Sequence, residues 1–218
     1  MSAVLTRILD CGVVAVMRSD RGDVLADVAE RLAAGGVIAI EVTFTVPQAH
    51  RVLESVASRL GDRIVLGAGT VLDPETARIA ILSGAEFIVS PTLNVAVIEM
   101  CKRYGKLVFP GAFTPTEILT AWQAGADIVK VFPADVGGPA YFKAIHGPLP
   151  SIRLMPTGGV DLDTAADFIR AGACALGVGS ALVRPQLVRS GNLTEIESLA
   201  RQFVEIVRQA RAENGQRR

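Results

Sequence analysis

Short hydrophobic runs recur along the whole chain, and each run after the first follows closely behind a glycine. The first run is 13–17, and the later runs span 37–43, 64–69, 87–91, 107–111, 128–132, 152–157 and 175–179. The preceding glycines stand at positions 35, 61, 84, 105, 125, 147 and 172, so their intervals, by subtraction, are 26, 23, 21, 20, 22 and 25 residues. Continuous apolar runs of this length are typical of parallel strands that are buried on both faces. The pattern therefore predicts eight parallel strands.

The stretches between the runs carry helical periodicity, for which 24–32 and 115–123 are two examples. Pro47, Pro74 and Pro115 stand where first helical turns are expected to begin, a position that tolerates the missing N–H of proline. Each recurring glycine is expected to end a helix in the left-handed conformation, because that conformation satisfies the last carbonyl groups.

Eight strands, each followed by a helix, predict an α/β fold in which the sheet closes into a (β/α)8 TIM barrel. An open dinucleotide-binding sheet is disfavoured, because no Gly-x-Gly-x-x-Gly motif follows the first run and Gly67-Ala-Gly69 continues with Thr-Val-Leu. Because 218 residues is near the short end for this barrel, residues 1–218 are expected to form one domain with its core at about 10–207. Residues 3–10 predict a helix that covers the barrel bottom, and residues 212–218 are expected to fray.

Composition and charge exclude several classes of protein. Hydrophobic residues make up 50% of the chain, which is enough to bury a core. The 22 basic and 22 acidic residues balance, which argues against a nucleic-acid or membrane-surface binder. No apolar run reaches the roughly 18 residues that a membrane span needs. The first residues lack the shape of a signal peptide, so a cytoplasmic location is expected.

The residues that commonly bind metals are few. Cys11, Cys101 and Cys174 are odd in number and far apart, and are expected to be free buried thiols in a reducing compartment. His50 and His146 are the only histidines, and the chain has no Cys-x-x-Cys motif. A zinc site is therefore not expected.

Chemistry is expected at the carboxyl ends of the strands, where TIM barrels gather their active sites. The residues at these ends are Arg18, 41–43, Thr70, Ser90, Pro91, Pro110, Gly111, 130–132, 157–159, Gly179 and Ser180. Lys130 is the most informative, because it stands inside the otherwise apolar Ile-Val-Lys-Val-Phe-Pro. Burying an ammonium is costly unless its pKa falls, and a lowered pKa is what a Schiff-base lysine needs. A strand-end lysine whose amine reaches solvent or pairs with a carboxylate is an equally good interpretation.

Glu41 ends the second run and would also be costly to bury without a partner. If Glu41 and Lys130 both point into the barrel mouth, the carboxyl group could move protons for a lysine adduct. A structural ion pair between the two is the alternative interpretation, and it is compatible with the catalytic one.

The seventh and eighth runs end in Gly158-Gly159 and Gly179-Ser180. The loops at these positions of a TIM barrel frequently bind phosphate through backbone N–H groups. Two tight turns are the alternative. Arg18, after the first run, could bind a carboxylate or phosphate as a bidentate fork, although a solvated arginine is slightly favoured by position alone.

Six motifs, in this order, make the chain resemble the 2-keto-3-deoxy-6-phosphogluconate (KDPG) and 4-hydroxy-2-oxoglutarate (KHG) aldolase family. They lie at 40–47, 67–71, 87–91, 129–134, 156–160 and 177–181, and the second and fourth read Gly-Ala-Gly-Thr-Val and Val-Lys-Val-Phe-Pro-Ala. The resemblance runs from about residue 10 to residue 185. It implies a class I aldolase, independent of metals and cofactors, that forms homotrimers. Its implied role is to cleave KDPG to pyruvate and glyceraldehyde 3-phosphate in the Entner–Doudoroff pathway of carbohydrate metabolism.

The resemblance also implies a role for each matching residue. Lys130 would form the Schiff base, and Glu41 would act as general acid and base. Thr70, Pro91 and Phe132 would line the pyruvyl end of the substrate, and Thr157 would contact its hydroxyl groups. Gly158, Gly159, Gly179 and Ser180 would hold the phosphate.

The chain departs from the family at one substrate-binding position. Many members have an arginine for the substrate carboxylate where this chain has Thr45. Arg18 is a plausible substitute, because the subgroup that resembles this chain has an arginine at the end of its first strand. This hypothesis would fail if Arg18→Ala left the Michaelis constant and turnover unchanged.

Other functions stay open. The galactonate epimer of the substrate is one, although the aldolases specific for it tend to have valine at the Thr157 position. A side activity on 4-hydroxy-2-oxoglutarate is compatible with the motifs. A phosphate-binding barrel isomerase would share the glycine loops without needing the lysine, and a non-catalytic barrel would be expected to have lost Lys130 and Glu41. Whether Lys130 forms an imine with a keto acid decides among these classes.

Overall fold

The computed structural model describes residues 2–216, and within them parallel strands alternate with helices. The strands are β1 (Val13–Met17), β2 (Ala39–Thr43), β3 (Val65–Gly69), β4 (Phe87–Val89), β5 (Leu107–Phe109), β6 (Gly111–Ala112), β7 (Val129–Val131), β8 (Leu154–Pro156) and β9 (Leu176–Val178). The α-helices are α1 (Ala3–Cys11), α2 (Leu25–Ala34), α3 (Ala49–Leu60), α4 (Pro74–Leu82), α5 (Val95–Arg103), α6 (Pro115–Gln123), α7 (Gly138–His146), α8 (Ala165–Arg170), α9 (Pro185–Ser190) and α10 (Leu193–Gln216). Three short 3-10 turns lie at Gly22–Val24, Gly61–Arg63 and Ala134–Val136.

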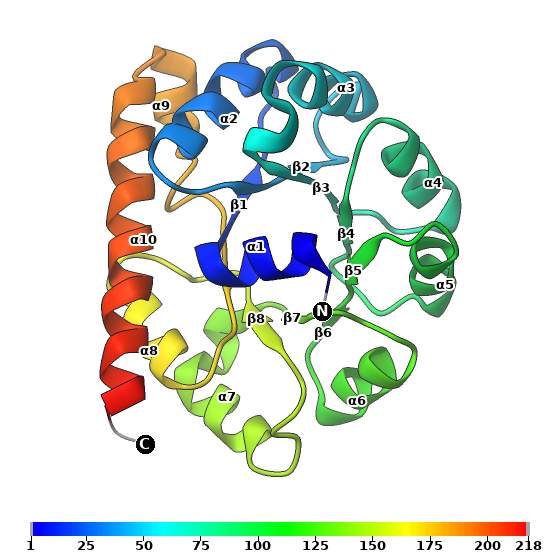
Figure 1. The fold of residues 1–218 in the computed structure, drawn as a ribbon, viewed down its shortest axis with the longest axis vertical. Helices are drawn as coiled ribbons and strands as arrows, with labels where there is room; N and C mark the ends of the chain where they lie inside the picture. The colour runs from blue at the N-terminus through cyan, green and yellow to red at the C-terminus, as the bar shows by residue number, and fades with distance from the viewer. Residues whose placement is uncertain (1, 217–218) are drawn as a thin grey trace.

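The strands form a curled parallel sheet in two parts. One part has the order β5-β4-β3-β2-β1-β9 and the other has the order β6-β7-β8. Pro110 alone separates β5 from β6, and an isolated parallel bridge joins Thr157, just after β8, to Gly177 of β9. The strands lie around a common centre with helices α2 to α10 outside them (Figure 1).

The fifth predicted strand differs from the prediction, because residues 107–111 form β5 and β6 rather than one strand. Proline has no N–H to donate to a neighbouring strand, so the ladder is interrupted at Pro110. The carbonyl oxygen of Pro110 still accepts a hydrogen bond of 2.9 Å from the backbone N–H of Lys130. The order of strands along the sheet is therefore kept across the interruption.

Local sequence signals explain where several helices begin. Asp73 accepts from the backbone N–H of Thr76 ahead of α4, with Pro74 in the first turn. Thr114 and Glu117 form a capping box around Pro115 at the start of α6. These side chains satisfy N–H groups that a helix start leaves without partners.

The strands are covered by apolar side chains on both faces. The larger cluster lies between the strands and the outer helices and includes residues such as Leu53, Phe142 and Phe203. The smaller cluster lies inside the curled sheet, where Leu5 and Ile8 of α1 pack with strand residues that include Phe87, Phe109 and Met155. Helix α1 lies across the centre of the strands, in blue in Figure 1. The predicted N-terminal helix therefore covers this end of the strands.

The C-terminal end differs from the prediction. Residues 212–216 were expected to fray, but α10 continues to Gln216; residues 217–218 lie outside the described part of the chain. Side chains near the end of α10 are held by the fold, because Asn214 donates to the carbonyl oxygen of Ile169 and Glu213 pairs with Arg170 at 3.0 Å. Polar composition alone did not reveal these contacts.

No helix within residues 2–216 combines the length and the apolar composition that crossing a bilayer requires. Cys101 is buried and Cys11 and Cys174 are half-buried, and all three are free thiols. Burial raises the pKa of Cys101 and of Cys174 to about 12, so both stay protonated and unreactive near neutral pH.

Candidate active site

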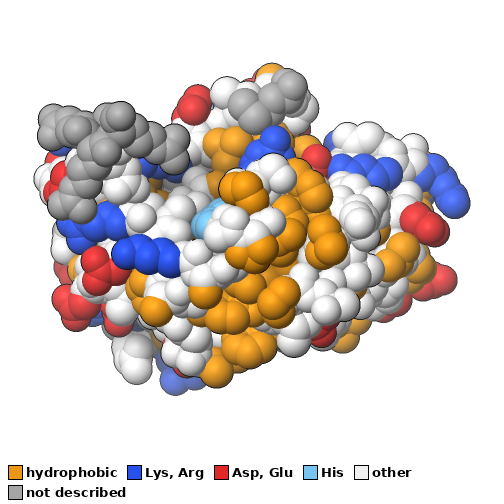
Figure 2. Space-filling view, turned by 90° about the horizontal axis from the view of Figure 1, so that it is seen from below, with side chains coloured by type: hydrophobic (Ala, Val, Ile, Leu, Met, Phe, Trp, Pro, Cys, Tyr) orange, Lys and Arg blue, Asp and Glu red, His pale blue; other side chains and the backbone are white. Residues whose placement is uncertain are grey.

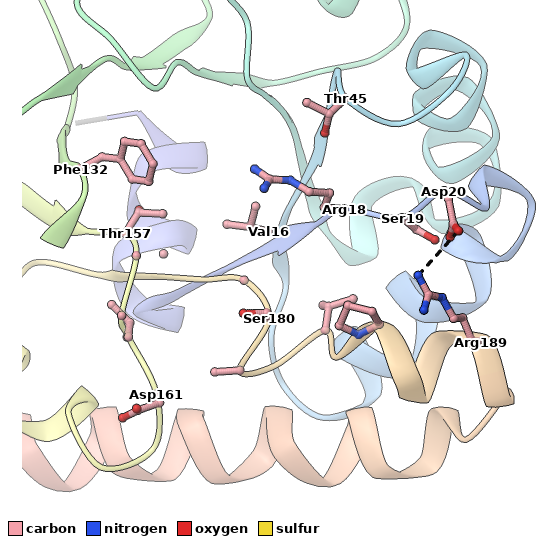
Figure 3. A pocket seen from close by; sticks show the side chains of 18 of the residues that line it. Val16, Arg18, Ser19, Asp20, Thr45, Phe132, Thr157, Asp161, Ser180 and Arg189 are labelled. Atoms are coloured by element: carbon pink, nitrogen blue, oxygen red, sulfur yellow. Dashed lines mark ion pairs between the residues drawn. The ribbon is translucent and has the colours of Figure 1, made fainter. Parts of the chain in front are cut away.

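A cavity of about 790 Å³ opens at the carboxyl ends of β1, β8 and β9. Eight of the residues predicted for the site line it, namely Arg18, Thr45, Phe132, Thr157, Gly158, Gly159, Gly179 and Ser180. Figure 3 shows the Arg18 side chain in the middle of this group, with Phe132 and Thr157 to one side. The fold thus brings together residues that are up to 162 positions apart, as the subtraction of 18 from 180 gives.

Lys130 and Glu41 are buried and are not among the residues that line the cavity. Lys130 of β7 is 6% exposed and Glu41 of β2 is 1% exposed. The Lys130 amine is 5.1 Å from the centre of the Phe132 ring, and Glu41 stands opposite Val16 in the pairing of β2 with β1. Because Phe132 and Val16 both line the cavity, the lysine and the glutamate lie one side chain away from it.

The two buried groups are not joined as an ion pair. Among the ion pairs of residues 2–216, none within 4.0 Å includes Lys130 or Glu41. The structural ion pair considered from the sequence is therefore not formed. The Lys130 amine is free of a carboxylate contact that would hold its proton.

Burial shifts the pKa values of both groups toward their neutral forms. Desolvation lowers the pKa of the Lys130 amine; the charge of Glu41 opposes this shift and that of Arg18 adds to it. Desolvation also raises the pKa of the Glu41 carboxyl, against the opposing charges of Lys130 and Arg18. A neutral amine is a nucleophile and a protonated carboxyl is an acid, so the pair suits addition of the amine to a carbonyl group.

Among the buried side-chain nitrogen and oxygen atoms of the described residues, two have no hydrogen-bond partner, and both belong to this site. They are Oε2 of Glu41 and Oγ1 of Thr157. A buried donor or acceptor without a partner costs free energy, so such atoms are rare in folded proteins. Both atoms are therefore available to a bound molecule.

Glycines in the strands make room for these two side chains. A Cβ added at Gly69 would be 2.4 Å from Oε1 of Glu41. A Cβ added at Gly177 would be 2.2 Å from Oγ1 of Thr157. Real Cβ atoms do not approach so closely, so the positions of Glu41 and Thr157 depend on the missing side chains beside them.

The loops after β8 and β9 offer free backbone donors to the cavity. Within residues 2–216, the N–H groups of Gly159 and Ser180 donate to no other backbone group. Gly158 and Gly159 have φ values of +90° and +69°, which side-chain-bearing residues rarely adopt. Free N–H groups in such loops can form an anion-binding surface.

Thr70 follows β3 with a φ of +56°, one of two positive values at non-glycine residues in the described chain. A β-branched residue in this region is strained, and such strain is concentrated at functional sites. Thr70 and Pro91 do not line the cavity. The carbonyl group of Pro91 instead packs so closely on Gly111 that an added Cβ there would be 2.2 Å from it. The predicted roles of Thr70 and Pro91 stay predictions.

Thr45 and Arg18 differ in how they are held. The Thr45 hydroxyl shares a hydrogen bond of 2.8 Å with the Thr43 hydroxyl, which lies 3.3 Å from the carbonyl oxygen of Met17. Arg18 lines the cavity and forms no ion pair among the residues that the structure describes. Its guanidinium is therefore the cation at this part of the cavity that is free to bind an anion.

Sequence reasoning missed several residues that line the cavity, including Ser19, Asp20, Pro185 and Arg189. Asp20 and Arg189 form an ion pair of 3.8 Å (Figure 3). Ser19 and Asp20 follow Arg18 directly, so the end of the first strand was a signal for them. Arg189 belongs to α9, and no local pattern placed it at the site.

The described residues contain no group of three or more His, Cys, Asp or Glu side chains that could hold a metal ion.

Comparison with known proteins adds independent information. Residues 4–199 match the family model of KDPG and KHG aldolase. The chain is 35% identical over 199 residues to a 2-dehydro-3-deoxy-phosphogluconate aldolase of Treponema pallidum (strain Nichols), covering 89% of this chain and 93% of the relative. It is 39% identical over 150 residues to a 2-dehydro-3-deoxy-6-phosphogalactonate aldolase of Escherichia coli (strain K12), covering 68% and 73%.

A solved structure with a related fold holds a trapped reaction intermediate. It is the KDPG aldolase from Legionella pneumophila, with pyruvate captured at low pH as a covalent carbinolamine intermediate. The two structures superpose with a TM-score of 0.86 at 26% sequence identity, covering 93% of this chain and 98% of that one.

Proposed function

This chain belongs to the KDPG and KHG aldolase family, and from that premise we propose that it is a class I aldolase acting through Lys130. The reaction is the reversible cleavage of 2-dehydro-3-deoxy-6-phosphogluconate to pyruvate and D-glyceraldehyde 3-phosphate. The observation that carries the proposal is the buried lysine whose amine contacts no carboxylate, beside a buried glutamate and behind a cavity with free anion-binding N–H groups.

Lys130 begins the reaction as a nucleophile. Its neutral amine attacks the C2 carbonyl of the keto acid to give a carbinolamine. The protonated Glu41 carboxyl donates a proton to the departing hydroxyl, which leaves as water, and a protonated imine remains. The directions in which burial shifts the pKa values of Lys130 and Glu41 support both steps.

The imine then accepts the electrons of the bond that breaks. Glu41, now a carboxylate, removes the proton of the C4 hydroxyl, and the C3–C4 electron pair moves toward the imine nitrogen. Glyceraldehyde 3-phosphate leaves and an enamine remains on Lys130. Protonation of C3 gives the pyruvyl imine, which water hydrolyses to pyruvate and the free amine. The protonated imine formed by the Lys130 amine is the electron sink, so no step of this mechanism requires a metal or another cofactor.

The remaining site residues hold the two ends of the substrate. Arg18 binds the carboxylate in place of the family arginine that Thr45 replaces. Thr70, Pro91 and Phe132 surround the pyruvyl end, while Gly158, Gly159, Gly179 and Ser180 hold the phosphate. The free guanidinium of Arg18 and the free N–H groups of the glycine loops support these roles.

The galactonate epimer is the second candidate substrate, because a galactonate-specific relative is 39% identical over 150 residues. The unpaired Thr157 hydroxyl favours the gluconate epimer, since a hydroxyl can hydrogen-bond a substrate hydroxyl and valine cannot. The kcat/KM ratio for the two epimers, measured with wild type and Thr157→Val, tests this preference. We expect Thr157→Val to lower kcat/KM for the gluconate epimer relative to kcat/KM for the galactonate epimer.

Two further features are part of the proposal. The strands form one closed (β/α)8 barrel, supported by the short break at Pro110 and the bridge from Thr157 to Gly177.

The chain also assembles as a homotrimer, supported by the family and by exposed apolar side chains such as Leu82 at 68% and Leu72 at 53%. Figure 2 shows a band of hydrophobic side chains on a further face, the one seen from below. Light scattering on wild type and Leu82→Glu tests the trimer. The cytoplasmic location stays a prediction.

Borohydride trapping tests the central claim. Wild type and Lys130→Ala are each incubated with pyruvate and borohydride and then analysed by mass spectrometry. A reduced pyruvyl adduct that maps to Lys130 in wild type and is absent from the variant supports the imine. A folded wild type without an adduct would remove the aldolase mechanism and favour a phosphate-binding isomerase or a non-catalytic barrel.

A further inference from the structure

The charged residues of the cavity lie in two places. Its lining contains two cations, Arg18 and Arg189, and two acids, Asp20 and Asp161. In Figure 3 Arg18 points toward the side of Phe132, whereas Arg189 lies beside Asp20 on the opposite side of the view. Arg18 is the arginine that acts electrostatically on Lys130 and Glu41, and Arg189 is not among the charges that do so. The two arginines therefore serve different parts of the cavity.

The two acids are not equivalent either. Asp161 is held by the start of α8, where Oδ1 accepts hydrogen bonds of 3.0 and 2.9 Å from the backbone N–H groups of Asp163 and Thr164. Its carboxylate is thus committed to the local turn. Asp20 contacts Arg189 at 3.8 Å, with the two side chains 71% and 66% exposed. This contact is too long for a hydrogen bond, and pairs so exposed contribute little to stability.

Arg189 is therefore a cation that changes partner at little cost. A phosphate dianion carries more charge than a carboxylate and matches the planar donor fork of arginine. The free N–H groups of Gly159 and Ser180 line the same cavity. A phosphate bound to them lies in the cavity that Arg189 also lines.

We propose that Arg189 is a specificity residue for phosphorylated substrates, whose guanidinium leaves Asp20 and binds the substrate phosphate at the outer side of the cavity. The inference rests on the proposed function, because it assumes that the keto-acid end reacts at Lys130. Arg18 and Arg189 then bind opposite ends of one doubly anionic substrate. The Asp20–Arg189 contact is the resting state of the pair.

The experiment compares two substrates that differ only in the phosphate, 2-dehydro-3-deoxy-6-phosphogluconate and 2-dehydro-3-deoxygluconate. Steady-state kinetics are measured for wild type, Arg189→Ala and Arg184→Ala. Arg184 is the matched control, because it is an exposed arginine at the start of the same helix that does not line the cavity. We expect Arg189→Ala to raise KM for the phosphorylated substrate about tenfold with kcat nearly unchanged. The unphosphorylated substrate and Arg184→Ala should show no change.

Two results would overturn the inference. One is a KM of Arg189→Ala that equals that of Arg184→Ala for the phosphorylated substrate. The other is an equal loss for both substrates, which would mark Arg189 as a structural residue. Trapping of the pyruvyl imine in Arg189→Ala at the wild-type rate keeps the two questions separate, because it tests the proposed function without a phosphate.

Discussion

The two ends of the curled sheet are built for opposite purposes. At the end that α1 covers, Leu5 and Ile8 belong to one buried apolar cluster with the stacked rings of Phe87 and Phe109, whose centres are 5.2 Å apart. At the other end Glu41, Lys130 and Thr157 are buried, and two of these three side chains have an atom without a hydrogen-bond partner. One end consists of apolar contacts, while the other keeps polar groups out of water.

The difference shows which end of the sheet stabilises the fold and which end contains reactive groups that lower its stability. Apolar burial at the α1 end stabilises the chain without requiring any particular reaction. Desolvated polar groups at the other end destabilise the empty protein and are satisfied by a ligand. Substitutions at the two ends should therefore separate activity from stability.

The largest expected effect is loss of activity at the polar end. Lys130→Met should reduce kcat at least about a thousandfold, because it removes the nucleophile. Its free energy of unfolding should not fall at neutral pH. Burial lowers the pKa of Lys130, so the unfolded chain binds the proton more tightly and the buried lysine destabilises the fold below its unfolded pKa. Steady-state kinetics and urea denaturation measure both quantities.

The exposed Lys143 provides the control for this substitution, since Lys143→Met should leave both quantities unchanged. A large loss of stability in Lys130→Met, with Lys143→Met unaffected, would show instead that Lys130 is a structural residue.

The complementary substitution is Phe87→Ala at the α1 end. Phe87 is fully buried, so its truncation should reduce the free energy of unfolding by about 3–5 kcal/mol. The kcat of the folded fraction should stay near that of wild type, because Phe87 begins β4 at the end opposite the cavity. Urea denaturation and kinetics at low temperature measure the two effects. Lys143→Met, the exposed control of the preceding experiment, should change neither by much.

A smaller effect is expected where the polar end depends on a missing side chain. Gly69→Ala should lower kcat roughly 10- to 100-fold, because the new Cβ would displace the Glu41 carboxyl, and misplacing a catalytic group by about 1 Å costs this much. Gly147→Ala is the control, since Gly147 has a φ of −53° and a Cβ there would make only ordinary van der Waals contacts, the nearest at 3.4 Å from the carbonyl oxygen of Ala144. Equal kcat in the two variants would contradict the proposed dependence of Glu41 on Gly69.

The smallest expected effects are opposite shifts in pH dependence. The rate of imine trapping with pyruvate should rise with pH as Lys130 loses its proton. Glu41 raises the pKa of Lys130 and Arg18 lowers it. Glu41→Gln should therefore move the rising limb to lower pH, and Arg18→Met should move it to higher pH. Shifts in the same direction would show that these charges do not act on Lys130 as the geometry indicates.

Local patterns predicted the helices and strands better than they predicted the conformation of the residues that end them. The predicted helix 115–123 is α6, because Pro115 and its capping box are contiguous in sequence. The left-handed glycine that ends α2 is Gly36 with a φ of +91°, whereas Gly35 has a φ of −81°. Gly147 ends α7 with a φ of −53°. A glycine permits the left-handed conformation, but the contacts made by the residues after the helix decide which residue adopts it.

The site could be predicted where it depends on residue type at strand ends, and not where it depends on distant contacts. Lys130 and Glu41 stood out because charged residues are unusual inside apolar runs. The Asp20–Arg189 contact joins a loop after β1 to α9, so no local spacing encodes it. The same holds for the break at Pro110, since proline was visible but its effect on pairing depends on the neighbouring strand.

Helix α10 is hydrogen-bonded to the carboxyl end of helix α1. Arg211 of α10 donates to the carbonyl oxygens of Asp10, at 3.1 Å and 201 residues away, and of Cys174, at 2.9 Å. During synthesis, the ribosome releases α1 long before Arg211 has been made. These two hydrogen bonds at the α1 end of the strands therefore form only after residue 211 has been translated. A truncation that removes Arg211 would remove both hydrogen bonds from this end of the strands.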